Sequence, residues 1–287
     1  MKKSVLKCGS MLVLLALAMA GCVSSPAQKK SEGQILYEKG ELDSAIAVCT
    51  DAIQANAEDY DAYYYRGRAY RDKGEYDKAI ADFTEIIRVR PHDVKALSDR
   101  GWTYMDKDEY PNAIADFTDV VTNPIYGGRE DLVLLGPRMA RFADRGVAYY
   151  LNGDYDLALE DFNRPAPRFD IRPHFYSGLI YEKRADYDRA IESFTKAIEI
   201  EPNLTDAYYW RGNAYFRKAD YDRAIADYTK AVELNPKYAV AYSNRGMAYY
   251  RKAEYDKAIV DLTEAVRLDP DNEVTKDNLE AAKRRGK

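Results

Sequence analysis

Small and apolar residues recur along the chain in units of about 34 residues, and each unit contains two segments with one apolar helical face. If every unit is numbered so that a recurring glycine stands at position 8, positions 4, 7, 8 and 11 share one face of a first helix. Positions 20, 24 and 27 share one face of a second helix. The pattern therefore predicts a series of two-helix hairpins, whose members we call helix A and helix B.

Three recurring residues identify seven units. Glycine stands at position 8 in Gly33, Gly67, Gly101, Gly146, Gly178, Gly212 and Gly246, at intervals of 34, 34, 45, 32, 34 and 34 residues. Alanine follows twelve residues later, at Ala45, Ala79, Ala113, Ala158, Ala190, Ala224 and Ala258. Four residues beyond it stand Phe83, Phe117, Phe162, Phe194, Tyr228 and Leu262, with Cys49 in the first unit. Small side chains at positions 8 and 20 allow the two helices to approach closely.

Tyrosine is frequent in the units, with 26 in the chain, and prolines close four units at Pro91, Pro202, Pro236 and Pro270. A 34-residue period with this order of Gly, Tyr, Ala, Phe and Pro resembles the tetratricopeptide repeat. The resemblance implies an all-α fold, an α-solenoid of about seven helix hairpins with a C-terminal capping helix. Units one to three fall at 31–121, and units four to seven with the capping helix fall at 139–287. We expect the capping helix to place Val274 and Leu279 inward.

Between these two sub-arrays, eleven extra residues predict an insertion loop at 122–138. Pro165 and Pro167 end helix B of unit four early, so the superhelix is expected to change direction here. Insertions in repeat arrays often carry function. The alternative is a lengthened loop in which residues 132–135 cover a helix end.

Position 7 is arginine and position 23 is aspartate in the same five units. The pairs are Arg66 with Asp82, Arg100 with Asp116, Arg145 with Asp161, Arg211 with Asp227, and Arg245 with Asp261. In a hairpin that turns near position 15, these positions lie at the same height. We therefore predict structural ion pairs between helices, within a unit or to its neighbour, in preference to a ligand clamp.

The N-terminal segment predicts that the protein is exported and located in the cell envelope. Residues 1–21 have the basic start and short apolar core of a signal peptide, too short to span a bilayer. They end in Met-Ala-Gly before Cys22, which resembles the bacterial lipobox, so Cys22 is the expected lipid attachment site. Val23 follows, which implies the periplasmic face of the outer membrane, or the outer face of the plasma membrane in a Gram-positive host. Residues 22–30 are expected to form a lipidated tether.

Composition and the absence of known catalytic motifs argue against two classes of function, nucleic-acid binding and catalysis. The chain is 46% hydrophobic and 32% charged, as in a folded protein, and without residues 1–21 it has 40 basic and 48 acidic residues. This acidity argues against binding nucleic acid. The sequence contains no GxxxxGK[ST], HExxH, GxSxG or CxxC motif. We expect no enzyme activity, no cofactor and no metal, and we interpret Cys49 as a buried, inert thiol.

In the tetratricopeptide repeat family, helix A lines a concave groove through positions 2, 5, 9, 12 and 13. The resemblance therefore implies the following groove candidates: Tyr64, Arg68, Arg71, Trp102, Tyr150, Phe175, Tyr209, Asn213, Phe216, Tyr250 and Arg251. Aromatic residues and arginines are common at binding hot spots. The alternative is that several of them pack between units. Position 5 lacks the lysine that the chaperone type of carboxylate clamp needs.

The main hypothesis is a membrane-tethered scaffold or adaptor that binds protein partners or peptide segments in the envelope through this groove. The alternative is a structural subunit of an outer-membrane assembly complex or of a pilus or secretion complex. Both rest on the combination of fold and anchor.

Overall fold

The computed structural model describes residues 31–122 and 132–287, and these residues form fifteen helices and no strand. The first eight helices are α1 (Glu32–Glu38), α2 (Leu42–Ala55), α3 (Tyr60–Asp72), α4 (Tyr76–Val89), α5 (Val94–Asp106), α6 (Tyr110–Thr122), α7 (Leu132–Asn152) and α8 (Tyr155–Phe162). The others are α9 (Arg172–Lys183), α10 (Tyr187–Ile200), α11 (Thr205–Arg217), α12 (Tyr221–Leu234), α13 (Ala239–Arg251), α14 (Tyr255–Leu268) and α15 (Glu273–Arg285). The predicted signal peptide, Cys22 and the tether lie outside the described residues.

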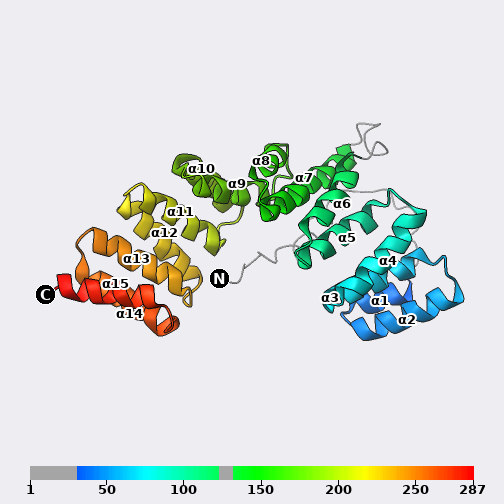
Figure 1. Cartoon of the computed structure of the whole chain (residues 1–287), viewed down its shortest axis with the longest axis horizontal. Helices are drawn as coiled ribbons and strands as arrows, with labels where there is room; N and C mark the ends of the chain where they lie inside the picture. The colour runs from blue at the N-terminus through cyan, green and yellow to red at the C-terminus, as the bar shows by residue number, and fades with distance from the viewer. Residues whose placement is uncertain (1–30, 123–131) are drawn as a thin grey trace.

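The helices pair in chain order into seven hairpins, which follow one another in an arc with α1 and α2 at one end and α14 and α15 at the other (Figure 1). Odd-numbered helices α1 to α13 are the A helices and even-numbered helices α2 to α14 are the B helices. The predicted all-α solenoid is confirmed. Within the described residues, no helix is long and apolar enough to cross a membrane.

The helices of a hairpin approach closely because glycine of helix A meets a bulky side chain of helix B. A methyl group added to Gly101 would lie 2.7 Å from the ring of Phe117, and one added to Gly178 would lie 2.6 Å from that of Phe194. Phe117 and Phe194 are completely buried. The missing side chain at position 8 therefore sets the distance between the two helices.

The two helices of each of the seven hairpins join through a tight turn whose central residue has a positive φ. This residue is Gly40, Gly74 or Gly153 in three units, but Asp108, Ala185, Ala219 or Ala253 in the others. At Ala219, the N–H of Ala219 donates to the carbonyl of Phe216 and the N–H of Asp220 donates to that of Tyr215. These two bonds form a Schellman motif and close the C-terminus of α11.

An ion pair links neighbouring hairpins along the edge where these turns lie. A basic residue at position 14 of one unit contacts the aspartate at position 18 of the preceding unit. The pairs are Lys73–Asp43, Lys107–Asp77, Arg184–Asp156, Lys218–Asp188 and Lys252–Asp222. At the junction between units three and four, the equivalent residues are Asn152 and Pro111. Neither can form the ion pair, so this junction lacks a link that the other five junctions have.

Two expectations differ from the structure. Helix α7 begins at Leu132, so residues 132–138 belong to a helix rather than to the expected loop, whose residues 123–131 lie outside the described part. In the capping helix α15, Leu279 is buried as expected, but Val274 is 69% exposed. The expectation for Val274 was wrong, and the inward residue of that turn is Thr275, whose hydroxyl bonds to Ser243 of α13.

Substitution of Gly101 by alanine should lower the free energy of unfolding by about 1–3 kcal/mol, because the new methyl group must displace the ring of Phe117. Chemical denaturation measures this change. Ala115→Ser, on the exposed side of α6, is the control and should leave stability unchanged. Equal stability of Gly101→Ala and the wild type would show that the helices are not in close contact here.

Replacement of Ala219 by glycine should raise the free energy of unfolding by up to about 1 kcal/mol, because glycine accepts a positive φ without steric cost. The same substitution at Ala226, an exposed position inside α12, should lower it by about 0.5–1 kcal/mol. Opposite signs for one chemical change would identify the turn geometry as the cause. A loss of stability in both variants would contradict it.

Candidate functional site

The arginines at position 7 hold each A helix between two B helices. In all five pairs, Nε and Nη2 of arginine donate to the two carboxylate oxygens of the aspartate, at 2.7–2.9 Å. The five aspartates are buried. The remaining nitrogen, Nη1, donates at 3.0–3.4 Å to a threonine of the preceding B helix, namely Thr50, Thr84, Thr118, Thr195 or Thr229. We call each arginine, with its aspartate and threonine, an Arg–Asp–Thr cluster.

Aromatic rings surround the same guanidinium groups. Arg66 lies 5.5 Å from the ring centre of Tyr63 and 6.0 Å from that of Tyr70. Arg145 lies between Phe142 and Tyr149 in the same way. Hydrogen bonds from the guanidinium to Asp82 raise the pKa of Arg66 further above its usual value. Each guanidinium nitrogen of a cluster therefore donates at least one hydrogen bond within the solenoid, which makes the clusters structural links.

The role of the threonine in the cluster was not predicted from the sequence, although threonine recurs at a fixed position of the repeat. Threonine occupies position 25 in six units, and asparagine replaces it only in unit four, at Asn163. Unit five, which follows, has Ser177 in place of the arginine. At this junction Arg172 takes over: it binds the carboxylates of Asp144 and Asp170 and the carbonyl of Ala140.

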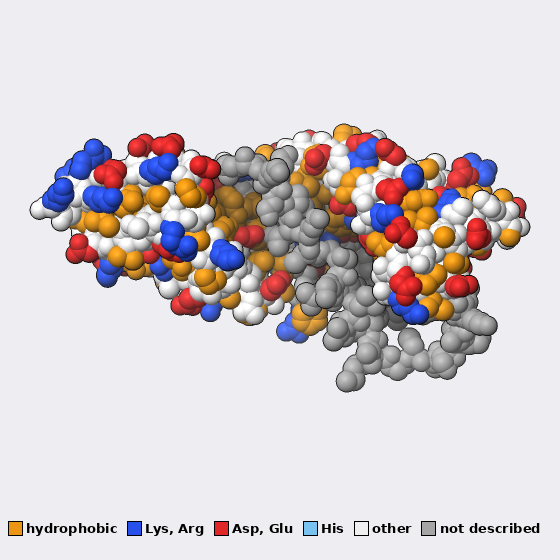
Figure 2. Space-filling view, turned by 90° about the horizontal axis from the view of Figure 1, so that it is seen from below, with side chains coloured by type: hydrophobic (Ala, Val, Ile, Leu, Met, Phe, Trp, Pro, Cys, Tyr) orange, Lys and Arg blue, Asp and Glu red, His pale blue; other side chains and the backbone are white. Residues whose placement is uncertain are grey.

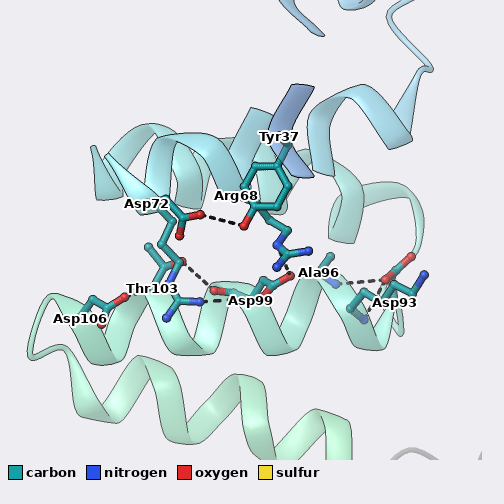
Figure 3. Close-up of polar contacts among 10 residues, drawn as sticks. Tyr37, Arg68, Asp72, Asp93, Ala96, Asp99, Thr103 and Asp106 are labelled. Atoms are coloured by element: carbon teal, nitrogen blue, oxygen red, sulfur yellow. Dashed lines mark hydrogen bonds and ion pairs between the residues drawn. The ribbon is translucent and has the colours of Figure 1, made fainter. Parts of the chain in front are cut away.

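With the B helices holding them, the A helices present a connected surface, which we call the helix-A face (positions 2, 5, 9, 12 and 13). In its N-terminal half, Tyr37 of α1 donates to Asp72 of α3 at 2.8 Å (Figure 3). Arg68 lies 4.7 Å from the ring centre of Tyr37 and 4.0 Å from the carboxylate of Asp99. Burial and the bond to Asp72 raise the pKa of Tyr37 to about 12, so this hydroxyl stays a neutral donor at physiological pH.

The next contact in this half follows the same register. Nε of Arg71 in α3 donates to Asp106 of α5 at 2.8 Å, and its Nη1 lies 3.9 Å from Asp99. Position 12 of one unit therefore meets position 13 of the next across neighbouring A helices. Burial also raises the pKa of Tyr64, whose hydroxyl bonds to Asp99.

In the C-terminal half, Asn213 of α11 accepts from Tyr228 at 2.7 Å and from Asn244 of α13 at 2.8 Å. Tyr209 packs against the rings of Trp210, Tyr228 and Tyr238. The aromatic candidates here are thus partly committed to packing between units.

The other groove candidates divide into surface and core. Trp102, Tyr150, Phe216 and Tyr250 are half-buried and contact aromatic rings of neighbouring helices. Arg251 is exposed. Phe175 is 4% exposed and packs edge-on against Phe194, so its assignment to the groove was wrong. Position 5 of unit five lies in the core, as do Tyr176 and Pro173 near it on α9.

An open pocket of about 580 Å³ lies beside the loop between α4 and α5. Its lining includes Tyr60, Tyr64, Arg90, His92 and Lys95. Arg90 stacks on the ring of Tyr60 at 4.7 Å. In the described ranges, no group of His, Cys, Asp and Glu residues could hold a metal ion. Asp61 and Asp93 also line the pocket, so it combines aromatic rings with charges of both signs.

Three family models for tetratricopeptide repeats match the chain, at residues 31–88 and 66–127, at 178–219 and 212–253, and at 239–272. A tetratricopeptide repeat protein from Parabacteroides merdae has a similar fold, with a TM-score of 0.58 and 21% identity over 87% of this chain and 95% of that one. The C-terminal part of a repeat protein from Cytophaga hutchinsonii gives 0.65 and 22%, over 86% and 98%. The Cut9–Hcn1 hetero-tetramer of the APC/C gives 0.62 and 19%, over 86% and 47%. No curated protein matches the chain.

Removal of one guanidinium should test the Arg–Asp–Thr clusters. The side chains of Arg211 and Asp227 are 17% and 8% exposed, so Arg211→Ala leaves a buried carboxylate without its partner. We expect a loss of about 3 kcal/mol in the free energy of unfolding. Arg223→Ala, which removes an exposed pair with Asp220, is the matched control and should melt like the wild type. Identical melting curves for Arg211→Ala and Arg223→Ala would contradict the structural role.

Proposed function

The chain belongs to the tetratricopeptide repeat family, and we propose that it is a membrane-tethered scaffold that binds protein partners in the cell envelope through its helix-A face. The fold supports a binding role because each hairpin repeats the same surface positions, so that successive A helices form one continuous strip. Among the described residues, no group of His, Cys, Asp and Glu side chains could hold a metal ion.

The main support for this proposal is that the two faces of each A helix differ: one makes contacts inside the solenoid, and the other is partly exposed to solvent. On one face, the arginines at position 7 have every nitrogen satisfied by aspartate and threonine. On the helix-A face, Phe216, Tyr250 and Arg251 remain partly or fully exposed on a rigid support. Exposed aromatic side chains and arginines held in a fixed geometry lose little entropy on binding and dominate protein interfaces.

The tether rests on the sequence of residues 1–30. Two or three acyl chains at Cys22 would hold the protein firmly at a membrane, since each buried CH₂ contributes roughly 0.8 kcal/mol. We place the protein at the periplasmic face of the outer membrane. In that position the solenoid would stay close to the membrane and bring its partners there.

Binding through the helix-A face can be tested by pull-down from native envelopes in mild detergent. The double variant Phe216→Ala/Tyr250→Ala should lose the partners that the wild type captures. Val260→Ala removes an apolar side chain that is 68% exposed on α14, away from the helix-A face, and should keep them. Thermal melts of both variants are needed to show that the solenoid remains folded. Capture of the same partners by the double variant and the wild type would contradict the proposal. It would favour a permanent assembly subunit that uses another face.

The anchor is tested separately by fractionation. Cys22→Ser should move the protein from the membrane fraction to the soluble fraction of the envelope and abolish labelling by radioactive palmitate. Cys8→Ser, within the predicted signal peptide, should change neither result. A Cys22→Ser protein that stays in the membrane fraction would argue against the lipid anchor.

A further inference from the structure

We propose that Lys183, Arg217 and Arg251, which we call the basic edge, bind an acidic segment of a partner protein. The inference rests on the proposed protein-binding function and specifies the chemistry of the partner. The three residues stand at position 13 of units five, six and seven, at the C-terminal ends of α9, α11 and α13.

The sign of the charge at position 13 reverses along the solenoid. Units one, two and three carry Glu38, Asp72 and Asp106 at this position. Unit four carries Leu151, and units five, six and seven carry the basic edge. The two halves of the helix-A face therefore differ in charge at equivalent places of the same backbone. Figure 2 shows basic and acidic side chains together at the C-terminal end of the molecule, where the last turn of α15 also carries Lys283, Arg284 and Arg285.

The acids of the N-terminal half are already engaged. Asp72 accepts from Tyr37, Asp106 accepts from Arg71, and Glu38 accepts from Gln34. These carboxylates accept hydrogen bonds inside the solenoid: Asp72 and Asp106 join neighbouring A helices, and Glu38 stabilises α1. A basic partner would have to compete with these contacts.

The cations of the basic edge are not engaged in this way. All three side chains are exposed, and no ion pair within the described part of the chain includes them. Lys183 lies 5.5 Å from the ring centre of Tyr155. The register that joins Arg71 to Asp106 would bring Glu182 opposite Arg217, yet no ion pair forms between them. Three exposed cations that form no ion pair within the described part of the chain mark a place that favours an anionic partner.

The neighbouring surface determines the kind of anion. Beside the basic edge, the helix-A face presents Tyr150, Leu179, Phe216, Met247 and Tyr250, all partly buried. A small inorganic anion would leave this apolar strip uncovered, whereas a peptide covers both features. Packed helices lie about 8–10 Å apart and an extended chain advances about 3.3–3.6 Å per residue. The segment should therefore carry an acid at roughly every third residue, with apolar side chains between them.

A second copy of this chain is the competing occupant, because its own acidic edge could face the basic one. The acids of that edge already accept hydrogen bonds from tyrosine, arginine and glutamine. Self-association would break those contacts, so an external acidic segment is the better match.

The test uses the full chain, in detergent, and a displayed library of random peptides of about twelve residues. Peptides retained by the wild type should be enriched in Asp and Glu at a spacing of about three. The enrichment should disappear with Lys183→Gln/Arg217→Gln/Arg251→Gln. A fluorescein-labelled retained peptide should lose roughly two- to fivefold in affinity for each cation removed, as exposed charge pairs do. Lys230→Gln, an exposed cation of α12, is the control and should bind like the wild type.

Three results would overturn the proposal: no acidic enrichment with the wild type, the same enrichment with the triple variant, or a dimer in sedimentation that the triple variant converts to a monomer while peptide binding persists. The last result would assign the basic edge to self-association. Partners that depend on Phe216 and Tyr250 in the pull-down but not on the basic edge would leave the proposed function intact and remove only this inference.

Discussion

The bidentate contact between a buried aspartate and the arginine at position 7 is the interaction on which the rest of the solenoid depends. Because the arginine also reaches a threonine of the preceding hairpin, one side chain fixes both the angle within a unit and the stacking between units. Five repetitions of the Arg–Asp–Thr cluster hold α3, α5, α7, α11 and α13 in one register. The glycine at position 8 sets the distance between the two helices, and the cluster fixes their relative height.

Unit four is where these links change. The junction before it lacks the lysine–aspartate ion pair because of Pro111 and Asn152, and its arginine–threonine contact is the longest of the five, at 3.4 Å. The junction after it lacks the cluster and relies on Arg172 with Asp144 and Asp170. Unit four also separates the units with an acidic residue at position 13 from the units with a basic residue there. Structural irregularity and the change of surface charge therefore coincide.

The repeat made most of the fold predictable from sequence. Helix A and helix B, their close packing and the pairing of Arg211 with Asp227 all follow from residues at fixed spacing, because a repeated environment repeats its requirements. The threonine at position 25 had the same signal, but it lies on a neighbouring unit, so its role needed the geometry of stacking. Two failures lie where the repeat is interrupted or ends: Leu132 extends a helix into the insertion, and Val274 faces solvent. The third is Phe175, which is buried in α9, the first helix after the shortened unit four. Ion pairing of the cations could not be predicted either: Arg71 at position 12 contacts Asp106 at position 13 of the next unit, whereas Glu182 and Arg217, at the same two positions of units five and six, form no ion pair.

We propose the helix-A face as the surface that binds protein partners. Photo-crosslinking in living cells tests it most directly, with a photoreactive phenylalanine analogue placed at position 216 of the helix-A face or at position 260 of the outer B helix. We expect discrete crosslinked proteins from position 216 and none from position 260. Crosslinks from position 260 alone would contradict it.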